Sequence, residues 1–256
     1  MVVNPFRMLC CLAAVVVLAS AASAGLVHEY RFDGDGIDSA DSANGAVGSL
    51  VTFDGSADGV PVCLDQAAVF GVGVDGTDDD EIRVPLADFT GFSTGDFSIA
   101  FWVRRDDAEG VTEDGVADAL AAGVMGWTIS FLSDDVVEVR LDDDATNTLS
   151  SSTTISLTAV DTWYHVALSV DRDDVAGLKW YVDGALDAGA TANPTGVSGA
   201  INPNQDVRFG AVNNSLGLDG ALGLLQFYDH ALTAGEVSAL FAAGSATDGR
   251  RRRCAG

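Results

Sequence analysis

The feature that most constrains this chain is the alternation of apolar and polar side chains along several short segments. In residues 97–103 (FSIAFWV) every second side chain is large and apolar. Residues 164–170 (YHVALSV) and 178–182 (LKWYV) follow the same pattern. Because successive side chains of a strand point to opposite faces of a sheet, this period of two predicts half-buried β-strands.

Other short segments have the same character and are separated by turns rich in glycine, aspartate and asparagine. Asp183-Gly184, directly after residues 178–182, predicts a two-residue type I′ hairpin turn. Further strands are expected at residues 26–32, 47–53, 67–70, 82–84, 127–132, 136–141, 207–211 and 221–228. Short strands at this spacing predict an all-β fold built as an antiparallel two-sheet sandwich.

One helix is expected after the last of these strands. Thr233 and Glu236 have the spacing of a capping box, and Val237, Leu240 and Phe241 form one apolar stripe. Gly244 is placed to end this helix. The segment 106–123 (DDAEGVTEDGVADALAAG) is instead interpreted as a long acidic loop between two strands.

The ends of the chain have compositions of their own. Residues 1–24 predict a signal peptide, with Arg7 before an apolar stretch and small residues before Gly25. We therefore expect a product that is secreted, periplasmic or on the cell surface, with no membrane span. Cleavage leaves Cys63 and Cys254, which an oxidising compartment allows to pair. Residues 245–256 are interpreted as a basic, mobile tail.

The charge of the chain disfavours one class of partner. It has 38 acidic and 13 basic side chains, a formal net charge of −25 at pH 7. A protein that neutralises phosphates needs clustered lysine and arginine, so nucleic acid is not an expected partner. The oligomeric state remains open at this point.

Six segments occur in a characteristic order: LVHEYRFDGDGIDSADSANG, GDFSIAFWVRR, DTWYHVALSVDRD, GLKWYVDGALDA, VRFGA and LDGALGLLQFYDHALTAGEVSALF. In this order they resemble the laminin G-like/concanavalin A-like jelly-roll domains of secreted bacterial proteins and, more distantly, the pentraxins. The resemblance covers residues 25–244. It implies a two-sheet jelly roll, often with a structural calcium ion, and most often a non-catalytic role in binding glycans or surfaces.

Calcium is the ion that the chain is expected to bind, because Ca²⁺ prefers carboxylate, amide and carbonyl oxygens. The first loop supplies Asp33, Asp38 and Asn44, although it lacks the EF-hand pattern. In the family this loop pairs with an acidic residue of the last strand. Here that strand reads Leu222-Gly223-Leu224, so Asp219 is the substitute that we expect. The alternative is that these residues only form turns.

A carbohydrate or cell-surface glycan is the expected partner. Trp102 and Tyr181 have the parity opposite to the core residues of their strands, so each can offer a flat ring for a sugar to stack on. His165, Lys179 or Arg104 would donate hydrogen bonds. Asn213 and Asn214 fall where pentraxins present calcium ligands, and we assign them to ligand binding. The alternative is that the aromatic residues pack in the core.

An enzyme on the same fold is the main functional alternative. Glycoside hydrolysis needs two carboxyl groups at a defined separation, and the E-x-D-x-x-E string of laminarinase-like members is absent. Gly91–Gly95 matches G-x-S-x-G but precedes a strand, so it is interpreted as a turn. The three histidines are scattered, and no Cys/His spacing indicates zinc. We expect a non-catalytic binding or adhesion module; a polysaccharide hydrolase or lyase and a structural envelope component are the alternatives.

Overall fold

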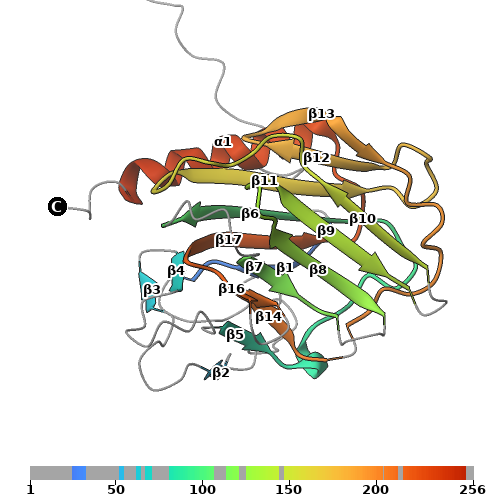
Figure 1. Ribbon diagram of the computed structural model, residues 1–256, viewed down its shortest axis with the longest axis horizontal. Coiled ribbons are helices and arrows are strands. Elements are labelled where there is room, and N and C mark those ends of the chain that lie inside the picture. The colour runs from blue at the N-terminus through green and yellow to red at the C-terminus, as the bar shows by residue number, and fades with distance from the viewer. Residues whose placement is uncertain are drawn as a thin grey trace, which may run out of the picture.

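The computed structural model describes residues 25–32, 52–54, 62–64, 67–70, 81–106, 114–120, 125–143, 147–203, 205–212 and 216–251. Within these ranges the strands form two large antiparallel sheets and one short pair, and a long helix lies along one side (Figure 1). This arrangement confirms the predicted all-β sandwich. The signal-peptide segment and the first acidic loop lie outside the described residues.

The order of the strands defines the two layers. In the part of the chain described, the eight-stranded sheet runs β13(Ala185–Ala192), β12(Leu178–Val182), β11(Trp163–Val170), β6(Phe97–Arg105), β17(Gly220–Tyr228), β4(Ala67–Phe70) and β3(Val62–Leu64), with β1(Leu26–Tyr30) also paired to β17. The seven-stranded sheet runs β10(Thr148–Ser152), β9(Val137–Asp142), β8(Gly126–Phe131), β7(Asp114–Asp118), β14(Val207–Phe209), β5(Glu81–Val84) and β2(Thr52–Asp54). The remaining elements are η2(Leu86–Asp88), the pair β15(Ala211–Val212) and β16(Leu216–Gly217), and α1(Ala234–Arg251).

The main core lies between the two large sheets. Phe227 of β17 packs against Trp127 of β8 and Phe209 of β14, with ring centroids 5.7 and 6.1 Å apart. The inward side chains of β6 and β11 join the same cluster, which confirms the parity that their alternation predicts. Asp183 and Gly184 both have positive φ, as a type I′ turn requires, and they join β12 to β13.

Residues 114–118 correct the sequence prediction, because they form strand β7 rather than part of a loop. This strand lies inside the seven-stranded sheet, between β8 and β14. Its acidic ends are paired with arginines: Asp114 contacts Arg105, and Asp118 contacts Arg208. Burial of an acidic strand is tolerated only with such partners; Arg105 is nine residues from Asp114, whereas Arg208 is 90 residues from Asp118.

The helix is a second correction, because it does not end at Gly244. It continues to Arg251 and so includes residues 245–251, which were expected to belong to the tail. Gly244 faces the Trp102 ring, and a Cβ atom there would overlap with the indole nitrogen. The glycine therefore permits close packing of the helix on the sheet. The predicted capping box is confirmed, since the Glu236 amide donates to the Thr233 hydroxyl.

Asp187 joins the edges of the two large sheets. Its carboxylate on β13 accepts hydrogen bonds from the amides of Thr154 and Ile155, at 2.6 and 3.2 Å, in the segment that follows β10. Burial raises the pKa of Asp187, but the hydrogen bonds from Thr154, Ile155 and Gly189 outweigh that effect and lower the pKa below its ordinary value.

We expect Asp187→Ala to lower the free energy of unfolding by about 1–3 kcal/mol, because the Thr154 and Ile155 amides lose their acceptor. Urea unfolding at pH 7 measures this. The control, Asp134→Ala, removes an exposed carboxylate from the turn between β8 and β9. In the parent protein the contribution of Asp187 is lost as the pH falls through the lowered pKa. Equal destabilisation by both substitutions would contradict the role given to Asp187.

Candidate functional site

A row of polar side chains crosses the outer face of the seven-stranded sheet. The register pairs Arg83 with Arg208, and Arg208 with Asp118. It continues from Asp118 to Thr128, from Thr128 to Arg140, and from Arg140 to Ser150. We call the six residues the polar row: Arg83, Arg208, Asp118, Thr128, Arg140 and Ser150. With about 4.8 Å between strands, the polar row is roughly 25 Å long.

Local alternation explains why these side chains point outward. Ile82, Phe209, Ile129 and Val139 are core residues of β5, β14, β8 and β9, and each adjoins a member of the polar row in sequence. Since alternate residues of a strand face opposite ways, burying these apolar side chains turns the polar neighbours away from the core. The polar row is thus the outer counterpart of the hydrophobic core.

An ion-pair network holds one half of the polar row. Arg208 lies between two carboxylates, with its Nε 3.3 Å from Glu81 and its Nη1 3.3 Å from Asp118. Glu81 also pairs with Arg83, and Asp118 accepts hydrogen bonds from the Leu120 amide and from Gln205. The side chains of Glu81 and Asp118 are only 3% and 0% exposed. Charged groups this buried need such partners, which also fix their orientation.

At the other end of the polar row, Arg140 and Ser150 are open to solvent, whereas Thr128 is only 8% exposed. The side chain of Arg140 is 47% exposed and contacts Asp142 at 3.0 Å, while Ser150 of β10 is exposed. A guanidinium and a hydroxyl on adjacent strands offer several donors and an acceptor in one plane. Such a surface can form hydrogen bonds with the hydroxyl groups of a ligand.

The structure brings three of the residues predicted to bind ligand together on the eight-stranded sheet. His165 lies opposite Trp102, and Tyr181 lies opposite Ala167, all with the outward parity that the sequence indicates. Their exposed fractions, however, are 2%, 5% and 3%, because α1 covers this face. The Phe241 ring of the helix stacks on Trp102 with centroids 5.7 Å apart and planes inclined at 19°. We call Trp102, His165 and Tyr181 the aromatic platform.

Burial leaves polar atoms of the aromatic platform without partners. Among the described residues, Trp102 Nε1 and His165 Nδ1 have no hydrogen-bond partner. Burial lowers the pKa of His165 to about 4, because the loss of hydration disfavours the charged imidazolium. Burial also raises the pKa of Tyr181.

The calcium prediction is not tested by the described residues. Asp33, Asp38 and Asn44 lie outside them, as do Asn213 and Asn214. Asp219 is partly buried, and its backbone carbonyl accepts a hydrogen bond from the Asp106 amide. The residues that the structure describes contain no group of three or more His, Cys, Asp or Glu side chains able to hold a metal ion. Calcium stays a prediction.

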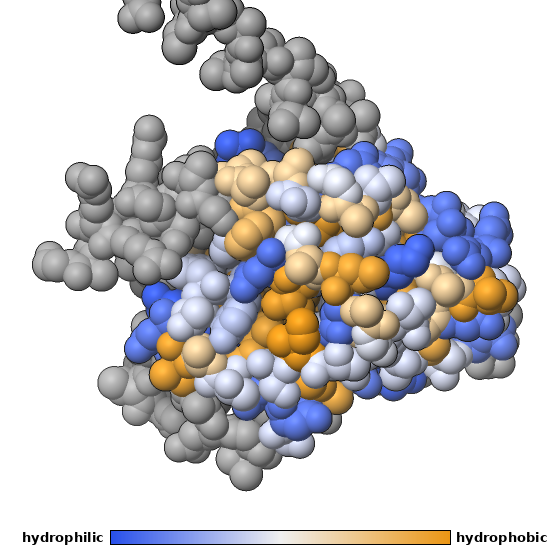
Figure 2. Space-filling model, turned by 90° about the horizontal axis from the view of Figure 1, so that it is seen from above, coloured by the Kyte–Doolittle hydropathy of each residue, from blue (hydrophilic) through white to orange (hydrophobic). Residues whose placement is uncertain are grey.

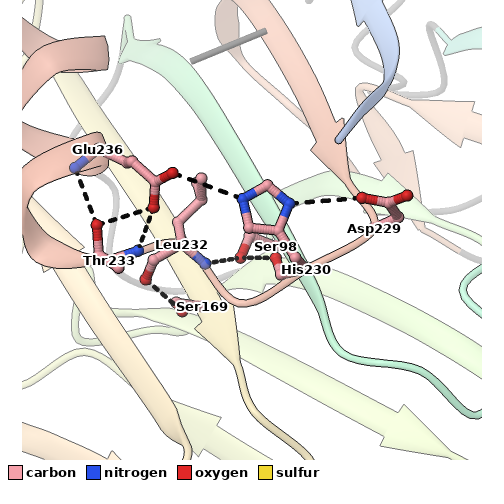
Figure 3. A network of polar contacts seen from close by, with 7 residues as sticks. All are labelled: Ser98, Ser169, Asp229, His230, Leu232, Thr233 and Glu236. Atoms are coloured by element: carbon pink, nitrogen blue, oxygen red, sulfur yellow. Dashed lines mark hydrogen bonds and ion pairs between the residues drawn. The ribbon is translucent and has the colours of Figure 1, made fainter. Parts of the chain in front are cut away.

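The histidines outside the aromatic platform have structural contacts. His28 Nε2 accepts a hydrogen bond from the Thr90 amide at 3.0 Å, and its ring stacks on Phe89. His230 lies between Asp229 and Glu236 at the start of α1, as Figure 3 shows.

The Gly91–Gly95 string forms a turn before β6, as expected, with the Gly95 amide donating to the Phe92 carbonyl. Cys63 lies in β3, and Cys254 is outside the described residues.

The polar row is the part of the site that sequence reasoning missed. The strings Glu81-Ile82-Arg83-Val84 and Val207-Arg208-Phe209 do alternate, so outward arginines could have been inferred. Their alignment with Asp118 could not, because it depends on the register between strands some 90 residues apart.

Comparisons with known proteins identify the architecture. A family model described as the concanavalin A-like lectin/glucanases superfamily matches residues 75–238. The chain is similar to the binding domain of botulinum neurotoxin serotype G, with 17% identity and a TM-score of 0.64 over 85% of this chain and 51% of that one. No curated protein sequence matches significantly.

Two further solved structures show the same likeness. The binding domain of botulinum neurotoxin DC in complex with SialylT has 14% identity and a TM-score of 0.64, over 87% of this chain and 52% of that one. The binding domain of Paraclostridial Mosquitocidal Protein 1 has 19% identity and a TM-score of 0.57, over 86% and 52%. The chain spans about half the length of these binding domains, and at such identities the likeness shows the fold.

The burial of His165 predicts a pH-dependent stability. Its folded pKa of about 4 lies below the ordinary 6.5, so the unfolded state takes up a proton first and stability falls as the pH drops below 6.5. Between pH 7 and pH 5 the loss amounts to about 2 kcal/mol. Urea unfolding at both pH values measures it. In His165→Gln the drop should be smaller by about that amount; an unchanged drop would contradict the assignment to His165.

Proposed function

The chain belongs to the concanavalin A-like lectin/glucanase superfamily, and we propose that it is a non-catalytic module that binds a carbohydrate or cell-surface glycan. The observation that carries this proposal is the polar row, in which charged and hydroxyl side chains of six adjacent strands share one register and Arg140 and Ser150 reach solvent. A rigid sheet holds these groups in place before the ligand arrives, which reduces the entropy lost on binding.

The likeness to binding domains supports the same proposal. One of the similar structures is described in complex with SialylT, and the cell entry of another, botulinum neurotoxin type C, is described as dependent upon interaction with two ganglioside molecules. In the described residues, no helix combines the length and apolar character needed to cross a bilayer. We propose export through the predicted signal peptide, which would place the module where glycans occur.

The carboxylates of the network favour binding over catalysis. A glycosidase needs one carboxyl group protonated, to act as a general acid, and a second one ionised. Here Glu81 and Asp118 both pair with the guanidinium of Arg208. This pairing suits them to hold Arg208 in position rather than to transfer protons.

We expect the full chain to retain at least one oligosaccharide on a glycan array without releasing reducing ends or unsaturated sugars. Arg140→Ala should weaken that binding about tenfold, as the loss of one hydrogen bond from a charged group implies. Titration calorimetry measures the affinity. The absence of retained glycan, or product formation, would contradict a non-catalytic glycan-binding role.

The chain offers a matched control for Arg140. Arg31 also pairs with a largely buried carboxylate two residues away in sequence, Glu29, and its side chain is 51% exposed against 47% for Arg140. It lies after β1, which belongs to the eight-stranded sheet. Arg31→Ala should leave the affinity unchanged; an equal loss in both variants would show that the polar row does not bind the glycan.

Calcium binding is a separate proposal that rests on the predicted ligands Asp33, Asp38, Asn44 and Asp219. An ion that binds only the folded protein raises the midpoint of thermal unfolding. We therefore expect a higher midpoint in millimolar calcium than in chelator, and no such difference in Asp38→Ala. Equal midpoints for the parent protein in the two conditions would remove calcium from the proposal.

A further inference from the structure

The outer face of the eight-stranded sheet carries aromatic side chains of the kind that bind sugar rings, although α1 lies over it. Trp102 and His165 face outward with ring centroids 5.3 Å apart, and Tyr181 lies on the same face. The apolar face continues to Leu186 of β13, which lies opposite Tyr181 and is 47% exposed. Figure 2, seen from the side where α1 and β13 lie in Figure 1, has its most hydrophobic surface near the centre.

The segment before α1 and the helix residues up to Leu240 are firmly attached to this face. The Ser98 hydroxyl donates to the His230 carbonyl and accepts from the Leu232 amide, both at 2.8 Å (Figure 3). The Ser169 hydroxyl donates to the Leu232 carbonyl, also at 2.8 Å. Leu232, Val237 and Leu240 then pack with Tyr181 and Tyr228 in a second apolar cluster. These contacts fix the chain as far as Leu240.

The part of α1 from Phe241 to Arg251 also covers polar atoms that lack partners, as the first part does with Tyr228 Oη. Phe241 and Gly244 cover Trp102, yet Trp102 Nε1 and His165 Nδ1 remain without hydrogen-bond partners in the described structure. Two buried polar atoms without partners weaken the contact that buries them. From Gly244 onward the sequence GSATDG also contains residues of low helix propensity. We expect the residues from Phe241 onward to be displaced at the smaller cost, because they follow the hydroxyl contacts of Ser98 and Ser169 and include this stretch of low propensity.

Phe241 occupies the place that a ring-shaped ligand would take. Its ring lies nearly parallel to the Trp102 indole, with His165 at 5.9 Å to the side. A sugar ring in that position would present its apolar face to the indole, and its hydroxyls could pair with Trp102 Nε1 and His165 Nδ1, which a phenyl ring cannot do.

We propose that the aromatic platform is a second carbohydrate-binding surface and that Phe241 and Gly244 of α1 cover it until a neutral sugar displaces Phe241. A neutral sugar is favoured because the chain is strongly acidic and four carboxylates lie around this face, those of Glu29, Asp183, Asp229 and Glu236. They outnumber the two basic side chains of the same parity on β6 and β12, Arg104 and Lys179. The inference rests on the proposed role in glycan binding but uses residues distinct from the polar row.

The test uses Phe241→Ala in the full chain, titrated calorimetrically with a panel of neutral oligosaccharides. Removing the phenyl ring should raise the affinity for at least one of them by about tenfold or more. The control is Leu240→Ala, which shortens an apolar side chain packed with Tyr181 and Tyr228 but leaves Phe241 stacked on Trp102. Adding Trp102→Ala to Phe241→Ala should abolish the gain. A folded Phe241→Ala protein with no gain over Leu240→Ala would overturn the proposal.

A second measurement needs no variant. In the parent protein, amide hydrogen exchange should be faster from Phe241 to Arg251 than from Ala234 to Leu240. The reason is that the segment from Phe241 onward separates from the sheet while the earlier turns stay attached. Equal protection along α1 would contradict a displaceable cover.

The two glycan surfaces can be separated with one more variant. If the gain of Phe241→Ala persists in the Arg140→Ala background, the aromatic platform binds independently, whatever the fate of the polar row. If Arg140→Ala removes the gain, the sugar binds at the polar row and the second surface is excluded.

Discussion

Packing between the inner faces of the two sheets is the interaction on which the rest of this structure depends. Phe227 on one sheet packs against Trp127 and Phe209 on the other. The strands around them contribute alternate apolar residues to the same core. Because neighbours in a strand face opposite ways, sealing this core also decides which side chains are presented outside. Both candidate surfaces are therefore consequences of how the interior is filled.

The outward side chains of the two large sheets differ in chemical character and in what they contact. On the seven-stranded sheet, the outward residues are charged or hydroxylated and pair with one another, as Arg208 does with Glu81 and Asp118. On the eight-stranded sheet they are largely apolar or aromatic, and an exposed face of that kind needs a cover. Helix α1 supplies the cover, fixed by two serine hydroxyls at its start and by Phe241 stacked on Trp102 further along.

Because the chain is strongly acidic, the positions of its few arginines determine which acidic segments can be buried. Arg105 contacts Asp114 and Asp135, and Arg208 contacts Asp118, so basic side chains lie where acidic strands are buried. With these partners the sequence DGVAD forms an internal strand, although by itself it is typical of a loop. The loop prediction for this segment was wrong because the partners are not its sequence neighbours.

The sequence by itself determined the features that depend on neighbours in the chain: the alternation of residues 97–103, the turn at Asp183-Gly184, the capping box of α1 and the outward parity of Trp102. Only the tertiary structure decided that α1 lies over that tryptophan, and that the polar row is aligned across six strands. The physical reason is the distance along the chain over which each kind of interaction acts. Periodicity and turn geometry act over a few residues, whereas strand register and helix docking depend on contacts between segments far apart in sequence, which no local pattern records.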